Sequence, residues 1–208
     1  MVIKQYKKEI VMSAIEQVIM NDFEKVYHGE NNFNDWYYSQ RSKLSLIADV
    51  ASGVTKGVFF CKEVPEIVIK TPILNDSDYC KRELDNYLKA EEEGFEDYFA
   101  EIEFFAELNG VPFYIQTAAD NDKALTSLWE SASHDALAYC DYESEEEKSD
   151  AINYYLDEIS DEERVDIFFG GVPPEFIQFL ERNEINDIHE GNIGVIGERK
   201  VIFDYSGW

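Results

Sequence analysis

Apolar side chains recur at helical intervals near the start of the chain. Between residues 3 and 27 they repeat every three or four positions, which is the spacing of one helix face. The pattern predicts an amphipathic helix that packs against another part of the protein. A polar, asparagine-rich stretch from His28 to Asp35 predicts a loop. The apolar positions are Ile3, Ile10, Val11, Ala14, Ile15, Val18, Ile19, Phe23 and Val26.

The pattern changes to short apolar runs between residues 44 and 70. Gly53, Gly57 and Pro65 interrupt the runs, and β-branched residues gather at their ends. This pattern predicts two or three antiparallel strands.

Two helices and a strand are predicted next. The first helix begins at the polar cap signal 75–78 and stops near Gly94, and a second helix covers 95–108. Asn109-Gly110 predicts a turn into a strand over 111–118.

The remaining sequence predicts helices followed by a terminal hairpin. The helices cover 126–140, 149–159 and 173–183, and the acidic segment 142–150 is expected to be a solvated loop. Two short strands are expected within 192–208. The chain is therefore predicted to be α+β, with a strand-rich N-terminal half and a helical C-terminal half.

Composition limits the function classes. Of the 208 residues, 45% are apolar and 14% aromatic, which is enough for a packed core. The net charge of -26 opposes binding to nucleic-acid backbones and anionic membranes. Two interpretations of the acidity remain open: it keeps the protein soluble, or it forms a surface for a basic partner, including mimicry of DNA.

The cysteines and the N-terminal segment predict a cytoplasmic protein. Cys61, Cys80 and Cys140 have neither paired nor metal-like spacing, so free thiols in a reducing compartment are expected. Charged residues interrupt the N-terminal apolar positions, which excludes a signal peptide, and no apolar run has the length of a membrane span.

The strongest chemical pattern lies near the C-terminus. Asp187 precedes Asn192 by five residues, and a predicted hairpin then leads to Asp204. This set suits phosphoryl transfer, because one carboxylate can orient an attacking hydroxyl and accept its proton. The amide and the second carboxylate supply hard oxygen ligands for Mg²⁺.

These residues resemble motifs of the protein-kinase superfamily. The Asp-x-x-x-x-Asn pattern of the family's catalytic loop matches Asp187 and Asn192, and Asp204-Tyr205-Ser206 stands where the family has a metal-binding Asp, an aromatic residue and Gly. The run DIHEGN is also similar to the catalytic loops of short phage kinases and of aminoglycoside and choline phosphotransferases.

The N-terminal half continues the resemblance. The strand ending in Lys70 is similar to the one whose lysine holds the α and β phosphates, and Glu83 on the next helix is the expected ion-pair partner. Residues 91–93 compete for that role, because they are glutamates on the same helix.

Two further segments resemble parts of an ATP site. Residues 52–58 take the place of the glycine-rich loop, although the family's first glycine is missing and its last is displaced by one position. Residues 113–118 resemble the strand whose backbone receives adenine. The resemblance therefore assigns ATP binding to Gly53, Gly57, Lys70, Glu83, Gln116 and Thr117.

The resemblance implies one kinase-like domain over 1–208. It would consist of a helical extension at 1–43, a strand-rich N-lobe with one key helix at 44–118, and a truncated helical C-lobe ending in a hairpin at 119–208. The usual His-Arg before the catalytic Asp is replaced by Ile185-Asn186, and the sequence ends four residues after Asp204. An activation loop and a peptide platform are therefore not expected.

Ordinary structural roles remain alternatives for these residues. Lys70 on a strand is often a solvated side chain, and Gly53 and Gly57 suit simple turns. Asp187 and Asn192 are common loop formers. His189 is expected to position its loop rather than to bind metal.

The predicted function is an ATP- and Mg²⁺-dependent phosphotransferase, a small protein kinase acting on a host or partner protein that is basic. By analogy with phage kinases it would work in a host cytoplasm. Asp187 and Lys70 would be catalytic, and Asn192 and Asp204 would bind metal. A pseudokinase that captures a partner, an acidic decoy that mimics DNA, and a nucleotidyl transferase remain alternatives.

Overall fold

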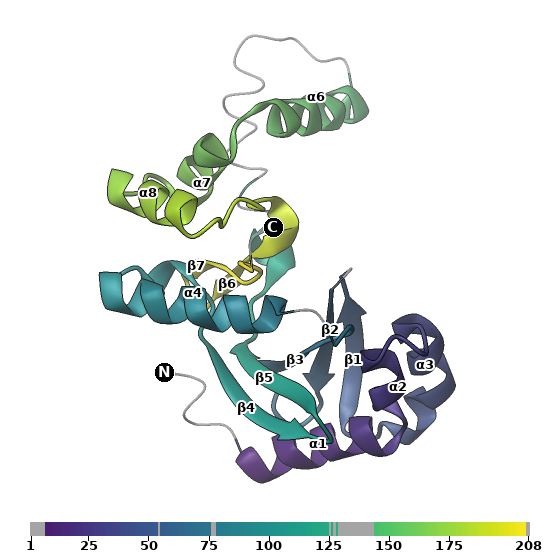
Figure 1. Cartoon of the computed structure of the whole chain (residues 1–208). Coiled ribbons are helices and arrows are strands. Elements are labelled where there is room, and N and C mark those ends of the chain that lie inside the picture. The colour runs from purple at the N-terminus through teal and green to yellow at the C-terminus, as the bar shows by residue number, and fades with distance from the viewer. Residues whose placement is uncertain are drawn as a thin grey trace. The chain divides into compact units, whose positions relative to one another are not determined.

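A computed structural model describes residues 7–53, 55–75, 78–124, 126, 128 and 144–206 of the chain. The fold is α+β, as predicted, with a five-stranded antiparallel sheet, helices and a separate two-stranded hairpin (Figure 1). The chain forms two compact units. The first unit comprises Met1–Glu96 with Ala100–Ala118, and the second comprises Asp97–Phe99 with Ala119–Trp208.

Short helices, rather than one long helix, open the first unit. The chain leaves the helical conformation at Asn21 and Asp22, and Asp22 has a left-handed φ of 64°. The loop predicted up to Asp35 is wrong at its end, because the Asn32 side chain accepts hydrogen bonds from the N–H groups of Asn34 and Asp35 and starts a helix there. The elements are α1 (Lys8–Met20), α2 (Phe23–Tyr27), α3 (Phe33–Gln40) and a 3₁₀ turn η2 (Arg41–Lys43).

The sheet has the order β1-β2-β3-β5-β4, with every neighbouring pair antiparallel. The strands predicted within 44–70 and 111–118 are confirmed. The helix predicted over 95–108 is wrong: a 3₁₀ turn η3 (Glu96–Tyr98) precedes a strand. The strands are β1 (Ile47–Ser52), β2 (Lys56–Cys61), β3 (Ile67–Pro72), β4 (Ile102–Leu108) and β5 (Val111–Thr117).

The turn between β4 and β5 explains that error. Asn109 and Gly110 both have positive φ, 51° and 80°, which matches the right-handed twist of a two-residue hairpin. Such a turn makes the preceding segment the partner strand of the following one, so tertiary pairing overrides the helical spacing of residues 95–108.

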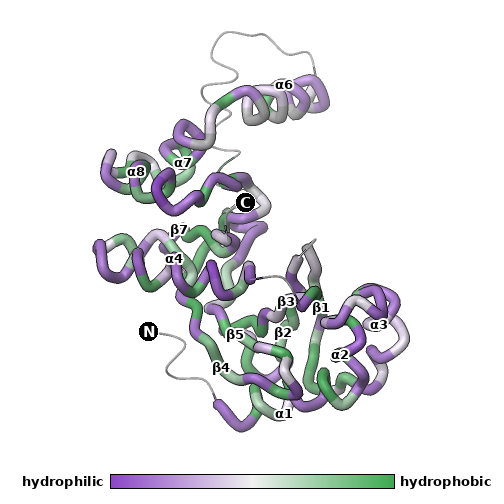
Figure 2. The backbone as a smooth tube through the Cα atoms, in the orientation of Figure 1, coloured by the Kyte–Doolittle hydropathy of each residue, from purple (hydrophilic) through white to green (hydrophobic). Residues whose placement is uncertain are grey.

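One face of the sheet packs against α1, α2 and α3, which confirms that the N-terminal helical segment is amphipathic. Figure 2 shows hydrophobic segments along the strands and along these helices. Phe23 is central to the contact, because its ring lies 5.0 Å from Trp36 and 5.7 Å from Phe59 on β2. The strand residues of this core include Ile47, Phe59, Ile67, Ile69, Phe113 and Ile115.

The predicted helix after β3 is confirmed as α4 (Tyr79–Glu93), and it contacts β3 and β4. It ends at Gly94, which adopts a left-handed φ of 79°. Part of the predicted cap signal, 76–77, lies outside the described residues. The helix buries one side of its surface, at Cys80, Glu83, Asn86, Tyr87 and Ala90.

In the second unit the helices predicted near 149–159 and 173–183 and the terminal hairpin are confirmed. The acidic loop predicted over 142–150 is wrong from Glu145 onward, because Ser144 accepts a hydrogen bond from Glu147 N–H and caps a helix. The elements are α6 (Glu145–Glu158), α7 (Asp161–Phe169), α8 (Pro174–Arg182), a 3₁₀ turn η4 (Glu190–Asn192), β6 (Ile193–Ile196) and β7 (Arg199–Ile202).

Helix α7 was not predicted, although its signal is present in the sequence. Ser160 and Glu163 form a reciprocal capping box at its start, and Gly170 ends it with a φ of 74°. The helix predicted over 126–140 lies outside the described residues except at 126 and 128.

Aromatic side chains build the core of the second unit. Phe99 forms a bridge with Ile202 of β7, and its ring lies 5.8 Å from Phe176 on α8 and 4.9 Å from Tyr205. This core fixes the hairpin and the residues that follow it. Among the helices that the structure describes, none combines the length and apolar character needed to cross a bilayer.

Candidate functional site

The predicted ion pair between Lys70 and Glu83 is present in the first unit. Lys70 Nζ lies 3.0 Å from Glu83 Oε2 and 3.3 Å from Oε1. Lys70 is 3% exposed and Glu83 is fully buried, whereas the competing glutamates 91–93 of α4 are exposed. Strand β3 is buried along its whole length, so a charged side chain there requires a partner.

A second lysine, not predicted from the sequence, joins this pair. Lys56 is the first residue of β2, and its Nζ lies 2.6 Å from Glu83 Oε1. It is 5% exposed. The signal that could have revealed Lys56 is strand alternation, because Lys56, Val58 and Phe60 share a face and Val58 pairs directly with Lys70.

The segment predicted to act as a glycine-rich loop is a tight hairpin. Gly53 is exposed, and its N–H donates to the carbonyl of Lys56 at 3.1 Å, so the turn uses this donor. Gly57 is buried, and a Cβ there would meet the ring of Phe33 at 2.5 Å. Gly57 therefore has a packing role against α3, while Gly53 lies at the end of the hairpin where β1 leads into β2.

Gln116 and Thr117 lie at the end of β5, and both are buried. Thr117 N–H donates to the Glu101 carbonyl, and Ala118 N–H donates to the Glu66 carbonyl, each at 2.9 Å. Gln116 pairs with Val68 of β3, two positions from the Lys70 pair, so it faces the same side of the sheet as Lys70.

In the second unit the structure brings Asp187 and Asn192 together. Asn192 Nδ2 donates to the Asp187 carbonyl at 2.8 Å and to Asp187 Oδ2 at 3.2 Å. His189 Nδ1 accepts from Gly191 N–H at 3.0 Å, and His189 Nε2 lies 3.6 Å from Asp187 Oδ1. His189 thus orders the loop and borders the carboxylate, in agreement with its predicted positioning role.

Asp204 follows the hairpin and is half-buried. Phe203 N–H donates to the Asn192 carbonyl at 2.9 Å, which joins the strand leading to Asp204 to the end of η4. The next residue, Tyr205, is 1% exposed and packs on Phe99, and Ser206 Oγ lies 3.4 Å from Asp204 Oδ1. A buried aromatic ring therefore anchors the backbone beside Asp204.

Asn192 and Asp204 carry oxygen atoms of the kind that hard cations take as ligands. Asn192 binds Asp187 through Nδ2, which leaves its carbonyl Oδ1 as the group for a cation. Asp204 supplies a carboxylate, and Mg²⁺ is commonly held by one or two such protein groups together with waters and phosphates. Among the described residues, no group of three or more His, Cys, Asp and Glu side chains is placed to hold a metal ion.

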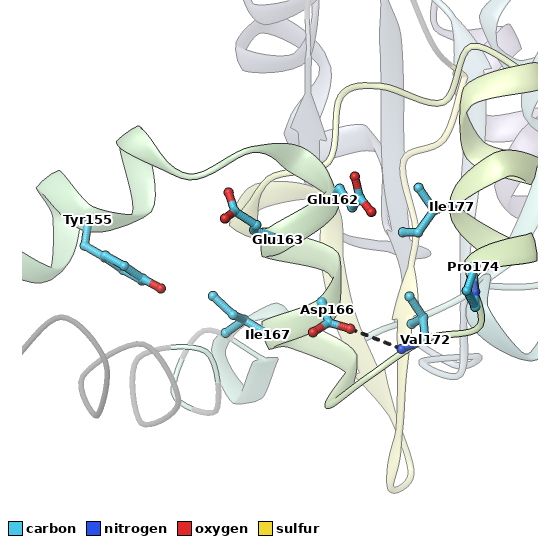
Figure 3. A pocket seen from close by; sticks show the side chains of 8 residues that line it. All are labelled: Tyr155, Glu162, Glu163, Asp166, Ile167, Val172, Pro174 and Ile177. Atoms are coloured by element: carbon cyan, nitrogen blue, oxygen red, sulfur yellow. Dashed lines mark hydrogen bonds between the residues drawn. The ribbon is translucent and has the colours of Figure 1, made fainter. Parts of the chain in front are cut away.

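A separate pocket lies among α6, α7 and α8 and has a volume of about 350 Å³. Figure 3 shows carboxylates at its wall and apolar side chains around them, with the ring of Tyr155 pointing in from α6. Asp166 Oδ1 accepts a hydrogen bond from Val172 N–H at 3.3 Å, which fixes the loop between α7 and α8. The lining residues are Tyr155, Glu162, Glu163, Asp166, Ile167, Val172, Pro174 and Ile177.

Comparisons with protein families, with curated proteins and with solved structures found no match to this chain.

Proposed function

We propose that this chain is an ATP- and Mg²⁺-dependent phosphotransferase that acts on a protein. The observation that carries the proposal is the buried contact of Lys70 with Glu83, from a central strand to the following helix. Taking charges out of water costs several kcal/mol per ion. A site with only a structural role could therefore have apolar side chains in place of the ion pair at little cost in stability. Buried, ion-paired charges beside a strand end are also found at functional sites, which supports the proposal.

The first unit would hold the phosphates of the nucleotide. Lys70 would contact them through its ammonium group, and Glu83 would keep that group oriented. The ion pair is preformed, so little side-chain entropy is lost when a phosphate adds to it.

The second unit would supply the acceptor-side chemistry. Asp187 would orient the acceptor hydroxyl and take its proton, and the Asn192 amide would keep the carboxylate in place. Asn192 Oδ1 and the Asp204 carboxylate would hold Mg²⁺. When bound, Mg²⁺ and ATP supply the neutralised phosphates and the phosphoryl group that is transferred.

Two labels test the reaction. The purified chain is incubated with Mg²⁺, a histone mixture and ATP labelled at either the γ or the α phosphate, beside Lys70→Ala and Asp204→Ala. Lys81→Ala, an exposed change on α4, is the control. Label from the γ position only, lost in both site variants and kept in the control, is the expected result. Transfer of label from the α position would show that the reaction is nucleotidyl transfer rather than phosphoryl transfer.

A nucleotide-binding protein without transfer activity is the second candidate. It is favoured by the hairpin after β1, where Gly53 N–H is used within the turn, and by Ser206, which stands where the resembling family has Gly. Under this candidate Mg-ATP raises the unfolding temperature, because it binds only the native state, while no label is transferred. If Mg-ATP neither raises the unfolding temperature nor leads to transfer of label, both candidates are overturned.

A basic protein is the proposed acceptor. The net charge of -26 favours encounter with a cationic partner, and the pocket among α6, α7 and α8 offers carboxylates beside apolar side chains. We expect a higher KM for histone in Glu162→Gln/Asp166→Asn, with the KM for ATP unchanged. Asparagine keeps the carbonyl oxygen that accepts from Val172 N–H, so the α7–α8 loop is retained.

A further inference from the structure

We infer that Arg164 and Lys200 are positioning residues that act through helix α7. Together they fix the Asp187 end of the loop 187–192 relative to the hairpin that leads to Asp204. The inference rests on the proposed function and adds to it two residues that the sequence motifs do not single out. Both residues act on the backbone of the site rather than on the nucleotide or the acceptor.

Arg164 connects helix α7 to the loop. Its Nη1 donates a hydrogen bond to the Ile188 carbonyl at 3.1 Å. Ile188 is 1% exposed, and it directly follows Asp187 in the chain. A buried carbonyl needs a hydrogen-bond donor, and a charged donor forms a stronger bond than a neutral one. Arg164 therefore holds the backbone beside the carboxylate that is proposed to orient the acceptor hydroxyl.

Lys200 connects the hairpin to the C-terminal end of helix α7. It lies on β7, and its Nζ donates a hydrogen bond to the Phe168 carbonyl. The same ammonium group lies 5.3 Å from the centre of the Phe168 ring, a distance suited to a cation–π contact. Phe168 belongs to the last turn of α7, where a positive charge is favourable because the carbonyl groups point out of the helix end. Lys200 therefore ties the hairpin to α7.

Helix α7 forms a rigid link between these two contacts. Arg164 and Phe168 are four residues apart, so they lie on the same side of the helix. Val165 and Phe168 are fully buried, which fixes the helix in the core of the second unit. The capping box at Ser160 and the left-handed Gly170 define its two ends.

The two contacts complete a closed path around the site. The Asn192 end of the loop is joined to the hairpin directly, because Phe203 N–H donates to the Asn192 carbonyl at 2.9 Å. The Asp187 end reaches the same hairpin through Arg164, helix α7 and Lys200. A displacement of about 1 Å within a reacting site can lower a rate roughly a hundredfold, so we expect this second link to affect the transfer step.

Transfer kinetics with γ-labelled ATP and histone test the inference. The variants are Arg164→Met, Arg164→Lys and Lys200→Met. Arg182→Met is the control for the arginine, because it makes the same change at an exposed position of α8. Lys123→Met is the control for the lysine, since Lys123 Nζ also donates to a backbone carbonyl, that of Gly197 in the hairpin turn, at 3.0 Å.

We expect Arg164→Met and Lys200→Met each to lower kcat on the order of tenfold to a hundredfold, with the KM for ATP unchanged. Arg164→Lys should recover part of the rate, because an ammonium group can also donate to the carbonyl. Arg164→Met/Lys200→Met should lose no more than the more damaged single variant, because either change alone breaks the same path. Both control variants should match the wild type.

An NMR signal from the loop separates a change of position from a general loss of stability. The chain has three histidines, and one of them, His189, accepts a hydrogen bond within the loop from Gly191 N–H. The ring signals of His189, assigned with His189→Gln, should shift in Arg164→Met, while those of His28 in the first unit stay in place. Circular dichroism and the unfolding midpoint establish that each variant is folded at the assay temperature.

The outcomes separate the inference from the function on which it rests. Wild-type kcat in either folded single variant overturns the inference alone, as does a lower kcat in Arg164→Met with unchanged His189 signals, because the loop has then kept its position. Losses that multiply in the double variant also overturn it, since they mark two independent structural contributions. Absence of transfer in the folded wild type overturns the proposed function and the inference together.

Discussion

The side-chain amide of Asn192 binds Asp187 twice, through the backbone carbonyl and through the carboxylate. The contact joins the two ends of the six-residue loop 187–192, whose middle is ordered by His189. Because one amide group sets the position of the carboxylate and also carries a potential metal ligand, the two proposed roles in the second unit are mechanically coupled.

Replacing Asn192 by alanine should therefore reduce phosphoryl transfer on the order of a hundredfold, the loss found when one oriented polar group is removed from a reacting site. The free energy of unfolding should fall by only about 1 kcal/mol. Initial rates with γ-labelled ATP and urea denaturation measure the two effects.

Asn183→Ala is the matched control, since Asn183 Nδ2 also donates to a backbone carbonyl, that of Phe179, at 2.9 Å. We expect a similar loss of stability with no loss of transfer. Equal activity in the Asn183 and Asn192 variants would remove Asn192 from the proposed site.

Glu83 should be the most sensitive residue of the first unit. Glu83→Ala leaves two buried ammonium groups without their shared carboxylate, and breaking a buried ion pair in this way costs about 3–5 kcal/mol. Urea denaturation should show this loss, while Glu92→Gln on the exposed side of α4 stays within about 0.5 kcal/mol of the wild type.

An apolar substitution of the whole cluster tests the cause of that sensitivity. Lys56→Met/Lys70→Met/Glu83→Leu removes all three charges, so it should recover much of the stability lost in Glu83→Ala. A triple variant as unstable as Glu83→Ala would show that packing, rather than uncompensated charge, explains the loss.

The two hairpin glycines should respond differently to alanine. A Cβ at Gly57 meets the Phe33 ring at 2.5 Å, so Gly57→Ala should lower the free energy of unfolding by about 1–3 kcal/mol. A Cβ at Gly53 meets nothing within 4 Å, so Gly53→Ala should leave stability nearly unchanged. Thermal unfolding of the pair decides between packing and turn roles, and equal melting temperatures would contradict the close approach of Phe33.

Tyr114 should control part of the alkaline unfolding of the first unit. Burial, with smaller contributions from Cys80 and Asp85, raises the pKa of Tyr114 from 10.0 to about 12. The unfolded chain loses this proton first as pH rises, so the contribution of Tyr114 is constant below pH 10.0 and stability falls between 10.0 and about 12.

Tyr114→Phe removes that proton. Melting temperatures measured from pH 8 to 11.5 should fall less steeply above pH 10 in the variant than in the wild type. Parallel curves would show that Tyr114 ionises equally readily in the folded and unfolded states.

Local signals were sufficient for much of the fold. Caps and glycines mark the end of α4 and the hairpin turns, and short apolar runs with β-branched residues at their ends mark β1, β2 and β3. The helix prediction for 95–108 is wrong because the apolar spacing of this segment is compatible with a helix, and only pairing with β5 selects the strand. From Glu145 onward the acidic run predicts a loop, but the Ser144 side chain caps a helix there.

The candidate site was predictable where motif residues lie close in sequence. Lys70 and Glu83 are thirteen residues apart on consecutive elements, and Asp187 and Asn192 share one loop. Lys56 was missed because a lysine beside a turn is normally solvated. Strand alternation places it on the same face as Val58 and Phe60, but its burial depends on the register of β2 against β3. Side-chain burial is a tertiary property that residue spacing alone does not express.

The packing of α1, α2 and α3 on the sheet also has a consequence during synthesis. These helices leave the ribosome before the sheet does, because the strands that cover their apolar faces extend to Thr117 at the end of β5. At translation speeds of about 5–20 residues per second, the interval from Trp36 to Thr117 lasts roughly 4–16 s. During that interval the apolar faces of the helices are not yet covered by the complete sheet. The yield of folded protein in a cell should therefore depend on chaperones that bind apolar segments of the nascent chain.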